Sequence, residues 1–344
     1  TAAAISYGVS GTGKNETVLV YDLGGGTFDI TVMNINGSQI SVVCTGGDDQ
    51  LGGKDWDECL MDYVMERYEE ENGEDLSEDP ETVASLYVDV ETWKKALTSR
   101  EKVNISVNGP AGRFREELTR EKYEELTGDL LSRTKNLLDG VLQTAAKQGY
   151  SMDKIDKVLL VGGSSRMPQV AAMIERDYHV VPTLSDPDEA VAKGAAIYAS
   201  NEKDYNDFVQ NEAAKTGKSV EELKEDSLIT GSLDKKYMQT GGGQLRISIT
   251  NVLSRTYGLA AYGEDGMMHI YNMLMINDAL PATKTEIYST RSDDQPGVEL
   301  EIYESRSTDS QIEIENRQPI TVVDMSFQRA VPRGTKIITT LALD

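Results

Sequence analysis

Residues 20–29 hold the side chains best suited to chemistry, an acid followed by three glycines and a threonine. Asp22 ends a short apolar run at 18–21, and a second apolar run follows at 30–35. Two apolar runs separated by glycines predict a pair of strands joined by a tight turn. The pattern therefore places Asp22 at the end of a buried strand.

A hairpin turn needs only one or two glycines, whereas this one has Gly24, Gly25 and Gly26 in a row. Glycine lets backbone N–H groups approach a ligand closely, and successive N–H groups form an anion-binding nest. Thr27 would offer a hydroxyl to a bound phosphate, and Asp22 would hold Mg²⁺ through water. The alternative is a glycine-rich hairpin with a solvated acid, because short glycine motifs have many chance matches.

A second glycine pattern occupies residues 157–169. A buried strand at 158–161 enters a Gly-Gly-Ser turn, and a helix begins near Pro168, since proline suits a first helical turn. Strand, glycine turn and helix in this order are the geometry of many nucleotide sites. Glycine in such a loop also serves packing alone, so this pattern leaves both interpretations open.

The other elements of the first 200 residues predict an α/β arrangement. The Asn-Gly pair at 36–37 predicts a turn in a strand meander at 17–46, and the glycine-rich loop 46–53 opens a helix. The helix at 186–196 is capped by an acidic residue and is rich in small residues. We also expect an exposed turn at 69–81, helices at 81–97 and 119–149, and strands at 103–107 and 113–118.

Residues 201–243 are polar and charged, which predicts a domain boundary with a mobile linker. Ser219 and Glu222 have the spacing of a capping box, so a short helix is expected after Ser219. From 244 onward the pattern is all-β and fits a β-sandwich. The expected strands are 245–250, 256–261, 268–275, 283–290, 298–303, 320–327 and 336–343.

Composition narrows the class of protein. The chain has 344 residues and a formal net charge of −24, which argues against a nucleic-acid binder with a basic face. No apolar run reaches the roughly 20 residues of a membrane helix, and we expect no membrane association. Cys44 and Cys59 are too few for a disulfide framework, so a cytoplasmic location is expected. The chain does not begin with Met and opens within an apparent helix at 1–8, so we expect a fragment.

Four stretches in order carry a family resemblance: DLGGGTFD at 22–29, GDDQLGGKDWD at 47–57, VGGSSRMP at 161–168 and DPDEAVAKGAA at 186–196. Together they resemble the second ATPase lobe of a DnaK-type heat-shock chaperone of the seventy-kilodalton class. PATK at 281–284 and SDDQPGV at 292–298 resemble that family's substrate-binding β domain. The resemblance implies an α/β fold with an actin-like (ribonuclease H-like) ATPase lobe at 1–200. An insertion or linker at 201–243 and a truncated all-β sandwich at 244–344 would follow.

The resemblance implies ATP or ADP and Mg²⁺ as cofactors of the intact protein. Asp22 matches a catalytic aspartate that orders Mg²⁺ and water, and Thr27 matches a catalytic threonine of the phosphate loop. The spacing of Glu91, Lys94, Lys95 and Thr98 places them on one face of a helix, which suits contact with a shared ligand. The same spacing is also found on an ordinary solvent-exposed helix face. The positions matching nucleotide contacts are Gly24, Gly25, Gly26, Thr27, Glu91, Lys94, Lys95, Thr98, Gly162, Gly163, Ser164, Arg166 and Asp188.

In the β-rich part, the resemblance implies a cleft for extended apolar peptides, with backbone pairing supplying affinity. The matching positions are Tyr262, Tyr288, Ser289, Arg291, Gln295, Val298 and Leu300. Val298 and Leu300 would serve equally as core residues of a sandwich. The implied partners are unfolded or extended peptide segments, a J-domain co-chaperone and a nucleotide-exchange factor.

The departures from the family pattern define the alternatives. The family's first phosphate loop and catalytic lysine precede Thr1, so we expect no significant ATPase activity from this chain. Asn251 replaces the aspartate of the interdomain linker, and Arg291 stands where the family usually has a small residue. The leading hypothesis is an ATP-dependent peptide-binding chaperone. The alternatives are a nonhydrolysing chaperone-like regulator and, less compatible with a β domain, an actin-like filament protein or sugar kinase.

Overall fold

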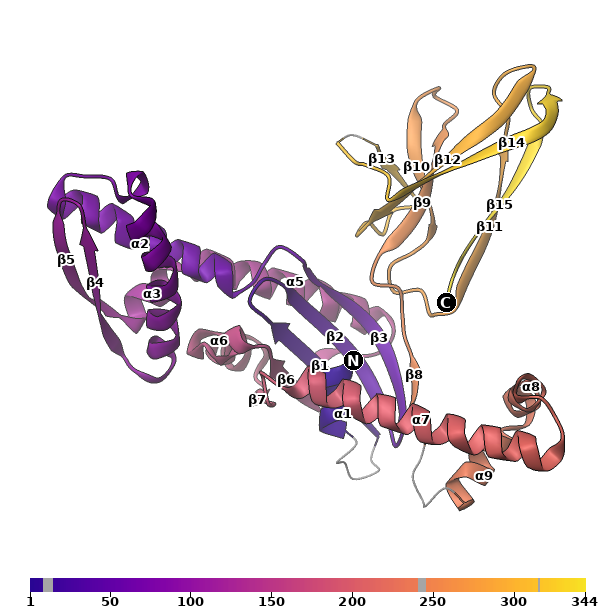
Figure 1. Cartoon of the computed structure of the whole chain (residues 1–344), viewed down its shortest axis with the longest axis horizontal. Helices are drawn as coiled ribbons and strands as arrows, with labels where there is room; N and C mark the ends of the chain where they lie inside the picture. The colour runs from indigo at the N-terminus through magenta and orange to yellow at the C-terminus, as the bar shows by residue number, and fades with distance from the viewer. Residues whose placement is uncertain (9–14, 241–245, 315) are drawn as a thin grey trace. The chain divides into compact units, whose positions relative to one another are not determined.

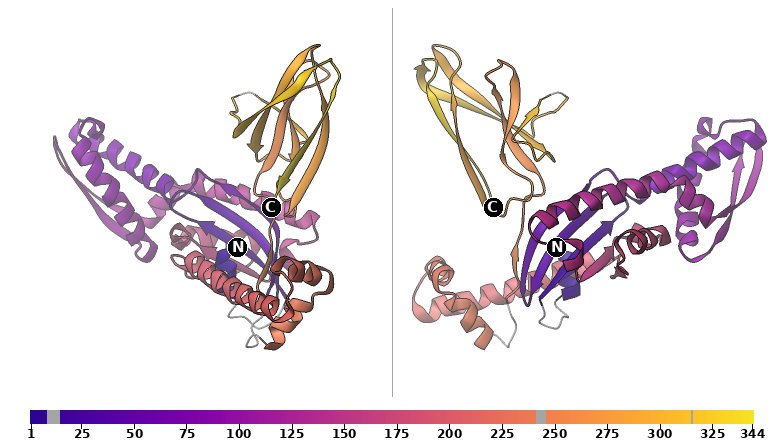
Figure 2. Two further views of the ribbon diagram at one scale, coloured as in Figure 1. Left: turned by 45° about the vertical axis from the view of Figure 1, so that its right-hand side comes forward. Right: turned by 180° about the vertical axis from the view of Figure 1, so that it is seen from behind.

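The glycine hairpin lies inside a six-stranded mixed sheet. Strands β1 (Asn15–Leu23), β2 (Phe28–Asn36) and β3 (Gln39–Asp48) form an antiparallel meander, and β6 (Lys157–Val161) runs parallel to β1. The strand order is β7-β6-β1-β2-β3-β8, where β7 is Thr183–Leu184 and β8 is Ser248–Thr250. These strands lie side by side in a twisted sheet (Figure 1, Figure 2). Pairing of β1 with β6 brings the two glycine turns to the same edge of the sheet.

The computed structural model describes residues 1–8, 15–240, 246–314 and 316–344. They form two units, Thr1–Ser248 and Ile249–Asp344. The helices of the first unit are α1 (Ala2–Gly8), α2 (Gly53–Asn72), α3 (Pro80–Ser99), α4 (Arg120–Leu126), α5 (Gly128–Lys147), α6 (Pro168–Tyr178), α7 (Ala190–Thr216), α8 (Val220–Thr230) and α9 (Ser232–Thr240). None of the helices in these residues is both long and apolar enough to cross a membrane.

Apolar side chains explain how these helices pack. In α5, Leu138, Val141 and Ala145 recur at helical spacing and are buried, and this helix packs on β2 and β3. Helices α2 and α3 pack together with the hairpin of β4 (Lys102–Gly109) and β5 (Gly112–Thr119). The described part of the unit also contains three short 3-10 turns: η1 (Leu76–Glu78), η2 (Met152–Lys154) and η3 (Gly163–Arg166).

Two helix predictions are wrong in extent. The single helix expected at 119–149 is two helices, because the chain breaks at Thr127, where the hydroxyl donates to the carbonyl of Tyr123 at 2.9 Å. Threonine and the glycine after it are both weak helix formers. The helix expected at 186–196 begins only at Ala190, and its N-cap residue Glu189 makes no side-chain capping bond. That helix then continues to Thr216.

The segment expected to be a mobile linker is helical in its described residues, 201–240. Helices α8 and α9 fold back beside the second half of α7 (Figure 1). They share a small apolar cluster of Tyr205, Val209, Leu223, Leu233 and Tyr237. The predicted capping box is confirmed. The Ser219 hydroxyl accepts from the N–H of Glu222 at 3.1 Å, and the Glu222 carboxylate accepts from the N–H of Ser219 at 2.8 Å. The polar composition of this segment favoured a linker, but burial of its aromatic and aliphatic side chains in this cluster stabilises a folded helical arrangement instead.

The second unit is antiparallel β structure, as expected, but the first strand predicted for it, at 245–250, is represented by β8 and lies beside β3 in the six-stranded sheet. A five-stranded sheet has the order β13-β10-β9-β12-β14, and β11 pairs with β15 in a two-stranded sheet. Strand β13 was not predicted from the sequence. The bounds are β9 (Thr256–Tyr262), β10 (Met268–Leu274), β11 (Ala282–Ser289), β12 (Gln295–Ser305), β13 (Gln311–Glu313), β14 (Thr321–Val331) and β15 (Lys336–Leu343).

Candidate functional site

Three glycine-containing loops of the first unit converge on one place. The carbonyls of Gly24 and Gly25 accept from the N–H groups of Gly53 and Lys54 at 2.9 and 2.8 Å. A Cβ on Gly52 would lie only 2.5 Å from the backbone nitrogen of Gly26, so no other residue fits there without displacing the backbone. These contacts fasten the hairpin turn to the start of α2.

The third loop packs behind the hairpin. Gly162 has a φ of +81°, and a Cβ there would lie 2.4 Å from the Leu23 carbonyl oxygen and 2.6 Å from the Asp22 carboxylate. The Ser165 hydroxyl accepts from the N–H of Leu23 at 3.2 Å and donates to the Val161 carbonyl at 2.6 Å. The ends of β1 and β6 are therefore locked together at the position of Asp22.

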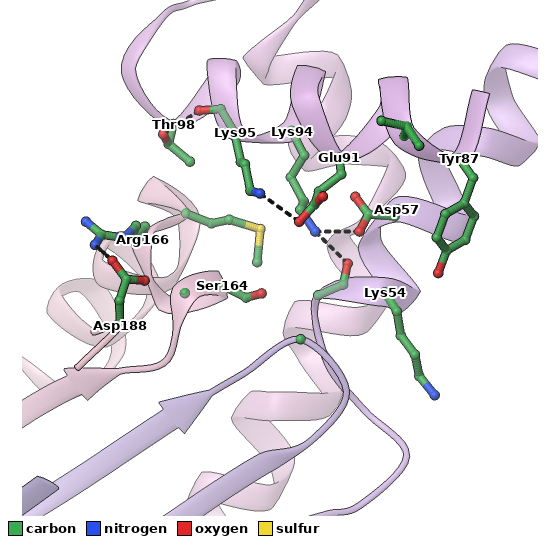
Figure 3. A pocket seen from close by; sticks show the side chains of 15 residues that line it. Lys54, Asp57, Tyr87, Glu91, Lys94, Lys95, Thr98, Ser164, Arg166 and Asp188 are labelled. Carbon is green, nitrogen blue, oxygen red and sulfur yellow. Dashed lines mark hydrogen bonds and ion pairs between the residues drawn. The ribbon is translucent and has the colours of Figure 1, made fainter. Parts of the chain in front are cut away.

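A pocket of about 870 Å³ opens beside these loops, between α3 and η3 (Figure 3). A pocket of this volume accommodates a small-molecule ligand of nucleotide size. In the described residues, nothing lies within 4 Å of a Cβ built on Gly25 or Gly26, so their backbone is openly accessible. The predicted residues that line the pocket are Gly25, Glu91, Lys94, Lys95, Thr98, Gly163, Ser164, Arg166 and Asp188.

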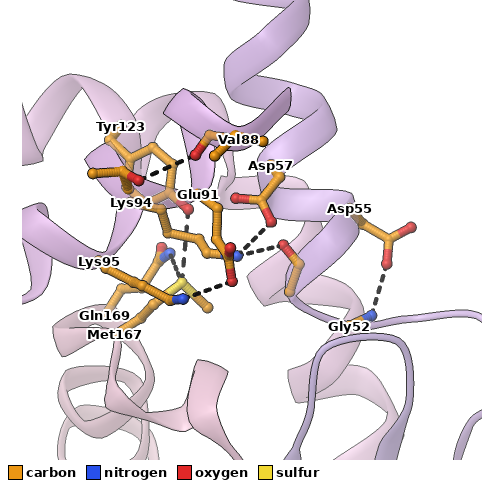
Figure 4. Close-up of polar contacts among 12 residues, drawn as sticks. Gly52, Asp55, Asp57, Val88, Glu91, Lys94, Lys95, Tyr123, Met167 and Gln169 are labelled. Atoms are coloured by element: carbon orange, nitrogen blue, oxygen red, sulfur yellow. Dashed lines mark hydrogen bonds and ion pairs between the residues drawn. The ribbon is translucent and has the colours of Figure 1, made fainter. Parts of the chain in front are cut away.

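Lys94 and Asp57 are the most enclosed charged residues of the pocket, each with 8% of its surface exposed. Lys94 makes the contacts that join them. Its ammonium group donates to the Asp57 carboxylate at 2.7 Å and to the Gly53 carbonyl at 2.8 Å (Figure 4). Burial raises the pKa of Asp57, and the bond from Lys94 opposes that rise. The pair joins α3 to the first turn of α2 and fixes the Lys94 ammonium group at the pocket wall.

Two further ion pairs lie at the solvent side of the pocket. Lys95 pairs with Glu91 at 2.8 Å along α3, and this bond lowers the pKa of Glu91. Arg166 from η3 pairs with Asp188, which precedes α7 (Figure 3). Arg166 lines the pocket, and a planar guanidinium is suited to stacking on an aromatic base. The Thr98 hydroxyl donates to the carbonyl of Lys95 at 2.7 Å.

Asp22, Gly24, Gly26, Thr27 and Gly162 do not line the pocket, although they form the loops behind it. Burial, followed by repulsion from Asp29, raises the pKa of Asp22. A cation would relieve both effects. The described residues contain no cluster of three or more His, Cys, Asp or Glu side chains that could hold a metal by themselves. One carboxylate fits Mg²⁺ when a nucleotide phosphate and water supply the other ligands, as this ion usually requires.

Asp57, Lys54, Tyr87, Val88 and Met167 also line the pocket, and residue patterns alone did not single them out. A signal for Asp57 was present, because it stands beside Trp56 and three residues before Leu60 on the buried face of α2. A carboxylate on an apolar helix face requires a partner. The sequence alone does not identify which basic side chain is the partner of Asp57.

In the second unit, the structure brings some predicted peptide-contact residues together. The Arg291 guanidinium lies 3.6 Å from the centre of the Tyr262 ring, and the Gln295 side chain accepts from the N–H of Arg291 at 3.0 Å. Val298 and Leu300 are two residues apart, so their side chains lie on the same face of β12, and both are half-buried. Tyr288 and Ser289 lie in the other sheet, near the end of β11.

The second unit also contains a fork between two strands. Strand β9 pairs with β12 from Thr256 to Leu259, opposite Ser305 to Ile302. Beyond that point, residues 260–262 pair only with β10, and residues 297–301 pair only with β14, among the residues that the structure describes. Among the described residues, the two strand edges that border this fork therefore have no partner strand.

A nucleotide-sized pocket on an α/β lobe, followed by a separate antiparallel β unit, defines an actin-like ATPase lobe joined to a β-sandwich. A family model described as "Hsp70 protein" matches residues 1–211, which is more than half of the chain. The chain belongs to the Hsp70 family. This family consists of heat-shock chaperones that generally bind ATP or ADP with Mg²⁺, together with unfolded peptides and co-chaperones, so the chain is a chaperone-type protein.

Proposed function

We propose that this protein is a DnaK-type chaperone that binds adenine nucleotide in the pocket of its first unit and extended apolar peptides in the fork of its second unit. The observation that carries the proposal is the pocket. Nine residues predicted to contact a nucleotide, from four separate stretches of the chain, line this one cavity.

Each part of a nucleotide has a matching group. The accessible glycine backbone at Gly25 suits phosphates, because N–H groups without side chains form an anion site. Lys94 and Glu91 would contact the ribose hydroxyls, and the Arg166 plane would stack on the base. Asp22 would order Mg²⁺ through water beside the phosphates. The bound ion would supply charge neutralisation, while the loops position the phosphate chain.

The fork supports the peptide-binding part of the proposal. An extended peptide inserted between 260–262 and 297–301 would pair its backbone with both edges, as in strand addition to a sheet. Val298 and Leu300 would then offer half-buried apolar contacts to alternate side chains of the peptide. J-domain co-chaperones and nucleotide-exchange factors are the partners that this function would require. A reducing cytoplasm suits the free thiols of Cys44 and Cys59.

The runner-up is a nonhydrolysing regulator, which the residue Asn251 favours. The backbone carbonyl of residue 251 also accepts from the N–H of Leu280 at 2.9 Å, so the segment after β8 is fastened within the second unit whatever side chain stands there. A regulator would bind nucleotide or peptide without linking the two events.

Titration calorimetry with MgADP and fluorescence anisotropy with an apolar peptide test the proposal on the same chain. We expect saturable binding of both ligands, and a nucleotide-dependent change in peptide affinity if the two events are linked. Lys94→Met should weaken nucleotide binding by more than about tenfold, because a charge-assisted contact to the ligand is lost. Lys102→Met, which breaks an exposed pair with Glu117 on β4 and β5, should leave it unchanged. Absence of heat at millimolar nucleotide would contradict the nucleotide site, and unchanged peptide affinity would favour the regulator.

A further inference from the structure

The two arms of the fork are bridged by one side-chain pair. Tyr262 ends β9 and is 51% exposed, whereas Arg291 belongs to the loop that leads into β12. The guanidinium carbon lies 3.6 Å from the ring centre, which is well inside cation–π range. Each residue therefore comes from a different side of the gap that the unpaired strand edges enclose.

The loop that carries Arg291 is held by its own hydrogen bonds. The Gln295 side-chain oxygen accepts from the N–H groups of Arg291 and Ser292 at 3.0 and 3.4 Å, and its amide nitrogen donates to the Gly297 carbonyl at 2.9 Å. The Asp293 carboxylate accepts from the N–H of Arg333 at 3.0 Å. These bonds position the loop, and with it the Arg291 backbone, at the entrance to β12.

No carboxylate of the described residues forms an ion pair with Arg291. Its guanidinium stacks on Tyr262. Stacking uses the flat face of the guanidinium and leaves the N–H groups at its edge available. A planar fork of donors of this kind matches a carboxylate, which it can bind through two parallel hydrogen bonds.

We infer that the Arg291–Tyr262 pair makes the fork selective for extended apolar peptides that carry an acidic side chain. This inference rests on the proposed peptide-binding function and specifies its substrate class. A peptide in the gap would pair its backbone with the two strand edges, and its Asp or Glu side chain would accept from Arg291. The Tyr262 ring would hold the guanidinium in place and contact a neighbouring apolar side chain.

Two electrostatic effects oppose each other in this preference: repulsion of an acidic peptide by the net charge of the chain, and its attraction to Arg291. The chain as a whole is strongly acidic, with a net charge of −24, so it repels acidic peptides at long range. That repulsion is screened beyond about 10 Å at 0.1 M salt, whereas a direct guanidinium–carboxylate contact persists. On β12, Glu299 and Glu301 alternate with Val298 and Leu300 and so point to the opposite face of the sheet. The contact with Arg291 therefore decides between peptides at physiological salt.

Two fluorescein-labelled peptides with the same apolar centre, one flanked by Glu and the other by Lys, test the inference by anisotropy with the full chain at 0.15 M salt. We expect the Glu-flanked peptide to bind about three- to tenfold more tightly, as a partly exposed charge-assisted contact would give. Arg291→Ala should abolish that preference, and Arg291→Glu should invert it. Arg317→Ala is the matched control, because Arg317 lies between β13 and β14, beyond the paired end of β12.

Tyr262 requires separate variants, because it acts through Arg291. Tyr262→Phe keeps the ring and should retain the preference, whereas Tyr262→Leu keeps apolar area and should reduce it. Equal binding of the two peptides by the unaltered chain would overturn the inference and leave peptide binding intact. Loss of all peptide binding by the unaltered chain would overturn both the inference and the proposed function.

Discussion

Lys94 of α3 is bound to Asp57 of α2 at 2.7 Å, with only 9% and 11% of the two side chains exposed. Removing one partner of a buried pair leaves an uncompensated charge, which typically costs about 3–5 kcal/mol. We expect Lys94→Met to destabilise the first unit by about that amount. Urea unfolding followed by tryptophan fluorescence measures it, because Trp56 and Trp93 adjoin the pair in sequence.

The pH dependence of Lys94→Met has a definite sign. Burial raises the pKa of Asp57, and loss of Lys94 removes the contact that opposes this rise. An acid with a raised pKa destabilises the fold above that pKa and ceases to do so once it is protonated. The variant should therefore lose more stability at pH 8 than at pH 5. Adding Asp57→Leu should recover most of the loss, and a double variant as unstable as the single one would refute the coupling.

The exposed pair of Glu91 and Lys95 serves as the contrast. Its side chains are 51% and 69% exposed, so Glu91→Ala should change stability by no more than about 1 kcal/mol. The same variant should weaken nucleotide binding, since Glu91 lines the pocket. Calorimetric titration of MgADP beside urea unfolding separates the two effects. An unchanged affinity of Glu91→Ala for MgADP would show that Glu91 does not contact the nucleotide.

Asp22→Asn should stabilise the nucleotide-free protein. The pKa of Asp22 is raised by burial and then by Asp29, so its charged form is disfavoured by the fold. That cost is fully present above the raised pKa and disappears as the pH falls toward the ordinary value of 3.8. Melting temperatures between pH 8 and pH 4 should show a gain that shrinks with acidity. With MgADP present, the variant should lose the additional stabilisation that Mg²⁺ gives over ADP alone.

Gly52→Ala tests the contact between the glycine loops. The added Cβ would lie 2.5 Å from the Gly26 nitrogen and 2.6 Å from the Gly25 carbonyl carbon. Overpacking of this kind costs about 1–3 kcal/mol and should also displace the glycine loop at 24–26. Thermal unfolding and MgADP titration should both worsen. Gly140→Ala in α5 is the control, because nothing lies within 4 Å of its Cβ, and it should stabilise by up to about 1 kcal/mol.

The helices after residue 200 should protect the segment at the end of the first unit. Asn201 is buried and accepts from the N–H of Ile247 at 2.8 Å, while Arg246 stacks 4.1 Å from the centre of the Tyr205 ring. Asn201→Ala and Arg246→Ala should each accelerate amide exchange across residues 246–250, read by mass spectrometry. Lys224→Ala on α8, which is exposed, should leave that exchange unchanged. Equal rates in all three variants would mean that the helices do not hold the segment.

Local patterns predicted the elements whose causes are local. The Asn-Gly turn, the glycine hairpin and the Ser219 capping box depend on backbone freedom and hydrogen bonds within a few residues. Because these patterns report only interactions within a few residues, they did not predict features that depend on packing between distant segments. The break at Thr127 and the length of α7 depend on what packs beside them, as do the helices at 201–240.

The sequence by itself determined which residue types and spacings suit nucleotide chemistry: the acid and glycines at 22–26, the charged face at 91–98 and the Gly-Gly-Ser turn at 162–164. Only the tertiary structure decided that Lys94 is neutralised by Asp57, 37 residues earlier, and that Arg291 rests on Tyr262. Residue type and short-range spacing settle what a side chain can do. Which group stands opposite it depends on how distant segments pack, because a charge or an aromatic ring accepts many partners until folding selects one.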